Sequence, residues 1–174
     1  MAAAQALAQL DQFDAVIDAR SEGEYALDHL PHAQNWPTLH DDERITIGTL
    51  YKQVSPFEAR KLGGVAAARN IAANIETHAL DKPKHWAPLT YCWRGGQRSG
   101  SLSMVLDQIG FKVTLVEGGY KAFRAAMLED IPLQAQRLQL EVVCGTTGCG
   151  KTRLLHALAA EGAQVLDLDR KSVV

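Results

Sequence analysis

Residues 87–99 read Ala-Pro-Leu-Thr-Tyr-Cys-Trp-Arg-Gly-Gly-Gln-Arg-Ser. An apolar run ends at Cys92, a glycine-rich turn follows, and a helical pattern begins at Ser99. A strand, a turn and a helix in this order are typical of an α/β fold with a parallel sheet. Ligands of such sheets bind beyond the carboxyl ends of the strands, where Cys92 lies. The stretch therefore predicts both a fold class and the position of a site.

The same alternation of apolar strands and helical patterns runs through the first part of the chain. Ser21 and Glu24 form the capping-box pattern that begins a helix, whereas residues 41–54 are polar and give no clear pattern. The alternation predicts a parallel sheet covered by helices. Strands are expected at residues 14–18, 89–92 and 112–116 with a short one after the loop at 30–37, and helices at 56–80 (interrupted at Gly63-Gly64), 99–109 and 119–128.

A second motif lies farther along the chain, at residues 145–152. It is a full match to G-x-x-x-x-G-K-[ST], and it lies between an apolar run at 138–144 and a helical pattern at 153–160, which is the context of a P-loop. In such a loop Lys151 would reach the β- or γ-phosphate, and Thr152 would hold Mg²⁺. The candidate phosphate-binding residues are Gly145, Thr146, Thr147, Gly148, Cys149, Gly150, Lys151 and Thr152.

The two motifs predict two domains. Residues 131–137 read as a linker, so a first domain is expected at 1–136 and the start of a P-loop NTPase-like α/β domain at 137–168. A further strand is expected at 165–168. Residues 169–174 back-translate readily to a common sequencing-adapter sequence, which predicts a non-native tail and a truncated second domain.

Composition excludes several classes of protein. The chain has 174 residues, of which 47% are hydrophobic, and a net charge of −2, so nothing drives it globally toward nucleic acid. No apolar window is long enough to span a membrane, and three cysteines without framework spacing suit a reducing cytosol, so a cytoplasmic protein is expected. Contact with RNA would need a local basic patch, for which the candidates are Arg94, Arg98, Lys112, Lys121 and Arg124.

Cys92 is the candidate nucleophile. Backbone N–H groups at a helix N-terminus bind anions and lower the pKa of a nearby thiol below its usual value of ~8.5. Arg94 and Arg98 add positive charge to the same loop, so all three are candidate catalytic residues. Asp18 and Arg20 are expected to form a structural ion pair. The candidate loop-backbone residues are Trp93, Gly95, Gly96 and Gln97.

Residues 18–25, 29–37, 92–99 and 116–124 resemble rhodanese-type sulfurtransferase domains. A rhodanese domain followed at once by a P-loop resembles the tRNA 2-selenouridine synthase family, whose form of the active loop is Cys-Trp-Arg-Gly-Gly-x-Arg-Ser. The resemblance covers residues 10–168. It implies a rhodanese-like parallel sheet in the first domain.

The resemblance also implies an activity, the transfer of selenium to tRNA. Cys92 would accept selenium from selenophosphate as an S–Se⁻ adduct and deliver it to C2 of a wobble 2-thiouridine. A geranylated thiouridine is the implied intermediate, with geranyl diphosphate as co-substrate and the P-loop as its natural site. Besides tRNA, the implied partner is a selenophosphate-supplying enzyme. No tightly bound cofactor or metal is expected apart from Mg²⁺ at Thr152, and the oligomeric state is not indicated.

The length of the cysteine loop leaves two alternatives open. Five residues separate Cys92 from Arg98, whereas thiosulfate-type rhodaneses have four. The wider loop suits selenium, but it equally suits the tetrahedral phosphate of a rhodanese-like cysteine phosphatase. A rhodanese-type sulfurtransferase is the other alternative.

Overall fold

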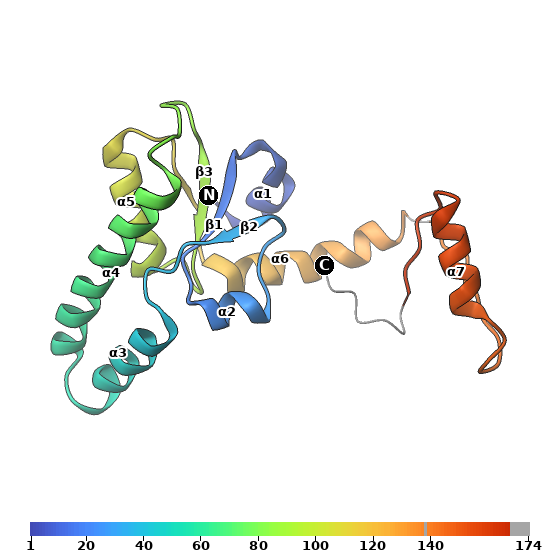
Figure 1. Ribbon diagram of the computed structural model, residues 1–174, viewed down its shortest axis with the longest axis horizontal. Helices are drawn as coiled ribbons and strands as arrows, with labels where there is room; N and C mark the ends of the chain where they lie inside the picture. Colours follow the sequence, from blue (N-terminus) through green and yellow to red (C-terminus); the bar gives the residue numbers. More distant parts are fainter. Residues whose placement is uncertain (138, 168–174) are drawn as a thin grey trace. The chain divides into compact units, whose positions relative to one another are not determined.

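The structure, a computed structural model, describes residues 1–137 and 139–167 (Figure 1). Its contacts define two compact units, one of residues 1–134 and one that begins at Ala135. The predicted non-native tail at 169–174 lies outside the described residues. No helix in the described part of the chain is long and apolar enough to cross a membrane.

The first unit is built on a four-stranded parallel sheet. The strand order is β2-β1-β3-β4, and Asp18 at the end of β1 pairs with Tyr91 at the end of β3. The carboxyl ends of the two central strands therefore lie together, next to Cys92. The α/β fold class predicted from the sequence is confirmed. The strands are β1 (Ala15–Asp18), β2 (Ala33–Asn35), β3 (Pro88–Tyr91) and β4 (Thr114–Leu115).

Helices cover both faces of this sheet (Figure 1). Val16 belongs to the core packed against α1 and α6, and its neighbour Ile17 to the core packed against α4 and α5. This alternation follows from the twofold side-chain period of a strand. The helices are α1 (Ala3–Ala8), η1 (Leu10–Gln12, a 3₁₀ turn), α2 (Glu22–Leu27), α3 (Asp41–Gln53), α4 (Pro56–His78), α5 (Gln97–Ile109) and α6 (Gly119–Ala135).

Three helical segments differ from the sequence prediction. Residues 41–54, which gave no clear pattern, contain α3; this helix buries no residue, so its sequence carries no apolar stripe. The predicted interruption of α4 at Gly63-Gly64 is wrong. A Cβ at Gly63 would lie 3.4 Å from Ile47 of α3, an ordinary van der Waals distance, and a Cβ at Gly64 would meet nothing within 4 Å, so packing requires neither glycine. The predicted linker is also wrong over residues 131–135, because α6 continues through Pro132.

The second unit contains α7 (Lys151–Ala160), which follows the glycine-rich loop. The structure describes residues 139–144 and 165–167, and neither range forms a strand. The strands expected at 138–144 and 165–168 are therefore wrong over these residues. A strand needs a neighbour to satisfy its backbone hydrogen bonds, and the described part of this unit supplies none. Residues 138 and 168 lie outside the described residues.

Candidate functional site

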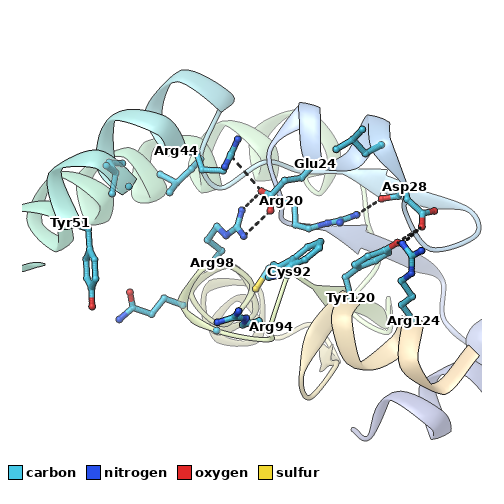
Figure 2. Close-up of a pocket in the computed structure, with 17 residues that line it drawn as sticks. Arg20, Glu24, Asp28, Arg44, Tyr51, Cys92, Arg94, Arg98, Tyr120 and Arg124 are labelled. Atoms are coloured by element: carbon cyan, nitrogen blue, oxygen red, sulfur yellow. Dashed lines mark hydrogen bonds and ion pairs between the residues drawn. The ribbon is translucent and has the colours of Figure 1, made fainter. Parts of the chain in front are cut away.

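A cavity of about 930 Å³ lies beside Cys92 (Figure 2). The cysteine loop forms one wall, and α2, α3 and the start of α6 supply the others. Six of the seven residues at 92–98 line it. The exception, Gly95, has φ +64°, and a Cβ there would lie 2.7 Å from the carbonyl oxygen of Val116. The cavity wall also carries five arginines and two carboxylates, namely Arg20, Arg44, Arg94, Arg98, Arg124, Glu24 and Asp28.

Cys92 is buried at the base of this loop, with 3% of its surface exposed. The hydroxyl of Ser99, in the first turn of α5, donates a hydrogen bond to the Cys92 sulfur over 3.0 Å. The sulfur therefore lies at the N-terminal end of α5, within hydrogen-bond distance of a side-chain hydroxyl. The sequence prediction missed this role of Ser99, although its position directly after Arg98 was the available signal.

The backbone of the loop is held from behind by the start of α6. The carbonyl oxygens of Cys92 and Trp93 accept hydrogen bonds from the amides of Tyr120 and Lys121 over 2.8 and 3.1 Å. Within the part of the chain that the structure describes, the backbone N–H groups of residues 93–98 have no acceptor. Unpaired amides in a tight loop at a helix N-terminus can bind an anion.

Arg98 is engaged by a carboxylate. Its two terminal nitrogens donate to Glu24 over 2.5 and 3.3 Å. Glu24 also accepts from the backbone N–H and hydroxyl of Ser21 in the capping box of α2. Burial favours the neutral acid, but the hydrogen bonds and charge of Arg98 keep the pKa of Glu24 below its ordinary value. Among the described residues Arg94 has no ionic partner, so its guanidinium is available to a ligand.

A buried ion pair lies behind the loop. The Arg20 guanidinium donates to Asp18 over distances of 2.7 to 3.0 Å, and both side chains are at most 1% exposed. The ion pair predicted from the sequence is confirmed. Arg20 also donates to the carbonyl oxygen of Asp28 over 2.6 Å. The Asp28 side chain accepts from the hydroxyl of Tyr120, so this residue ties α2 to α6.

The glycine-rich loop of the second unit closes around Lys151. The Lys151 ammonium donates to the carbonyl oxygens of Gly145 and Thr146, each over 2.9 Å. Gly148 and Gly150 have φ values of +84° and +85°, which side-chain-bearing residues rarely adopt. Among the described residues no group of three or more His, Cys, Asp or Glu could hold a metal ion.

The parallel sheet and the cysteine loop define a rhodanese-like domain. Residues 2–126 match the rhodanese-like domain family, to which the chain belongs. It is also similar to the crystal structure of the N-terminal domain of a Clostridium difficile 630 protein provisionally named as ATP/GTP binding. That similarity has a TM-score of 0.61 and 34% identity, and it covers 74% of this chain and 98% of the other.

Curated relatives indicate which kind of rhodanese-like protein this chain resembles. The chain is 36% identical to a tRNA 2-selenouridine synthase of Nitrosomonas europaea over 88% of its own length, and 38% identical to that of Psychromonas ingrahamii over 82%. The resemblance predicted from the sequence is confirmed. The chain spans about 40% of the length of these relatives.

Proposed function

We propose that this chain carries the chalcogen-transfer centre of a tRNA-modifying transferase of the 2-selenouridine synthase type. The observation that carries the proposal is the buried sulfur of Cys92 in a loop whose six following amides lack acceptors within the described residues. Relatives bearing this name at 36% and 38% identity support the choice of reaction.

Cys92 is the nucleophile in this proposal. Its sulfur attacks the selenium of selenophosphate, so that an S–Se bond forms and the Se–P bond breaks. The bonding electron pair stays on phosphorus, which is reduced by two electrons and leaves as phosphite, while selenium is oxidised by two electrons. The amides of residues 93–98 and the guanidinium of Arg94 hold the phosphorus oxygens by charge-assisted hydrogen bonds. Arg98 orients the loop through Glu24. Attack on phosphorus instead would give a phosphocysteine and free selenide, as in a cysteine phosphatase.

The terminal selenium of the S–Se⁻ adduct then attacks C2 of a geranylated wobble 2-thiouridine in tRNA and displaces the geranyl thiolate. An external thiol attacks the Cys92 sulfur of the resulting S–Se–C2 link, so that the S–Se bond breaks with its electron pair on selenium, and a second thiol reduces the disulfide left on Cys92. A geranyl group on the C2 sulfur makes that sulfur a better leaving group, because it departs as a thiolate. We assign the supply of the geranyl group to the P-loop, where Lys151, Thr152 and Mg²⁺ would bind geranyl diphosphate. A selenophosphate-supplying enzyme is the proposed partner, and the cytoplasm, where tRNA is modified, the proposed compartment.

The test is selenium transfer from selenophosphate to an anticodon stem-loop RNA that contains geranylated 2-thiouridine. Wild-type protein should form 2-selenouridine, and the isosteric variant Cys92→Ser should form none. Retained transfer by Cys92→Ser would refute the role of this sulfur. Thiosulfate:cyanide transfer without selenouridine would favour the sulfurtransferase, and hydrolysis of phosphate esters would favour the phosphatase.

A further inference from the structure

Trp93 is the most exposed of the three tryptophans. Its exposed fraction is 40%, against 1% for Trp36 and 5% for Trp86. It follows Cys92 directly and lines the same cavity. A large aromatic side chain left open beside a nucleophile offers a flat apolar surface to whatever enters the cavity.

The ring of Trp93 is supported on one side. It stacks on Tyr120, with ring centroids 5.5 Å apart and an angle of 27° between the planes. The Arg20 guanidinium lies 4.2 Å from the Tyr120 ring centroid and 5.9 Å from that of Trp93. Since Asp18 holds Arg20 in turn, the indole is positioned in advance, which lowers the entropic cost of binding a planar ligand.

Cationic groups surround this aromatic surface. Arg94 is the next residue along the loop. Arg124, which pairs with the Asp28 carboxylate over 3.5 Å, lines the cavity from α6 with 62% of its side chain exposed. Selenophosphate alone would need the amides and the guanidinium, but it has no flat apolar face to place on an indole. An aromatic platform next to arginines is the combination that binds an unstacked base and its backbone phosphates.

We propose that Trp93 is a stacking platform for the target pyrimidine of a single-stranded RNA loop, which places C2 of the base beside Cys92. This inference rests on the function proposed above and assigns the base-binding residue of that site. The RNA must be single-stranded there, because a base inside a duplex cannot reach an indole in a cavity.

Intrinsic fluorescence tests the inference, because Trp36 and Trp86 are buried and changes on binding report mainly on Trp93. The probes are an anticodon stem-loop RNA with 2-thiouridine at the wobble position and the same RNA with an abasic wobble position. We expect saturable quenching by the first and much weaker quenching by the second. Trp93→Leu should weaken binding of the thiouridine stem-loop about 10-fold or more by gel shift. Phe57→Leu, which removes an exposed aromatic ring outside the cavity, should bind as wild type does.

Three results would overturn the stacking role of Trp93: equal quenching by the abasic RNA, unchanged affinity in Trp93→Leu, and no saturable quenching by wild type. Thermal unfolding of Trp93→Leu shows whether lost affinity reflects lost folding. If it does, Trp93→Phe, which keeps an aromatic face, takes its place and must still bind the thiouridine stem-loop more tightly than the abasic RNA. Selenium loading of wild-type Cys92 from selenophosphate needs no RNA. Failure of loading therefore overturns the proposed function, whereas loading without stacking overturns only this inference.

Discussion

Glu24 and Arg98, which are 74 positions apart in the sequence, form a two-pronged ion pair at the wall of the cavity. Glu24 belongs to the first turn of α2 and Arg98 to the first turn of α5 (Figure 2). The same carboxylate closes the capping box of α2 with Ser21. One side chain therefore fixes both the start of a helix and the orientation of the loop arginine.

Replacement of Glu24 should separate these two roles. Glutamine can still accept from Ser21 but loses the charge that holds Arg98, whereas alanine loses both. We expect Glu24→Ala to lower the free energy of unfolding by about 1 to 3 kcal/mol, and Glu24→Gln by less. Urea denaturation monitored by circular dichroism measures both. Equal stability of wild type and Glu24→Ala would contradict a stabilising role of Glu24.

The same pair gives stability a defined pH dependence. Burial acts to raise the pKa of Glu24, but Arg98 holds that pKa below the ordinary value of 4.5. The Glu24–Arg98 ion pair therefore contributes its full stabilisation above pH 4.5. This stabilisation is lost as the pH falls through the lowered pKa that Glu24 has in the folded state. The difference in unfolding free energy between wild type and Glu24→Gln should shrink over that interval. A difference that stays constant down to the lowest pH at which both fold would contradict this.

Gly119 should tolerate no side chain. Its φ is +61°, and a Cβ would lie 2.2 Å from the carbonyl oxygen of Cys92 and 2.4 Å from the amide nitrogen of Gly95. Gly119→Ala should therefore cost at least about 1 kcal/mol in strain and displace the cysteine loop, with loss of selenium loading. Gly100→Ala is the matched control, because a Cβ there meets nothing within 4 Å and alanine favours the helix. Similar melting temperatures for the two variants would contradict the predicted clash.

Lys151 provides a separate test of the second unit. Its ammonium donates to loop carbonyls, and we expect it to turn to phosphate oxygens when a diphosphate binds. Lys151→Ala should weaken binding of inorganic pyrophosphate at least about 10-fold by calorimetry. Arg153→Ala removes a neighbouring positive charge outside the motif and should have a smaller effect. Equal losses in the two variants would mean that only general charge attracts the anion.

The sequence predicted those parts of the fold in which local pattern and tertiary packing agree. The apolar run ending at Tyr91 is a strand buried on both faces, and Gly110 ends α5 in a left-handed conformation, as its position suggests. The residues of α3 show no helical apolar pattern in the sequence because none of them is buried. Helix α6 continues through Pro132, although proline has no backbone N–H to donate to the helix. A proline in the sequence usually predicts the end of a helix, so the sequence alone predicted a linker here.

The residues of the candidate site also fall into two groups, those that the sequence predicts and those that only tertiary packing brings together. Cys92, Trp93 and Arg94 lie next to one another in the sequence, so one motif reveals them. Glu24 and Asp28 reach the cavity only because α2 packs beside the cysteine loop, and no local sequence pattern predicts that contact. The pairing of Arg98 with a carboxylate likewise depends on a partner far away in the chain.

Transfer of selenium through Cys92 predicts that selenophosphate leaves an adduct on this sulfur. The protein is incubated with selenophosphate, digested without reductant, and the peptide that contains Cys92 is analysed by mass spectrometry. We predict an added mass with the isotope pattern of selenium in wild type and no adduct in Cys92→Ser. A phosphoryl group without selenium on Cys92, or an unmodified cysteine, would contradict transfer of selenium through this sulfur.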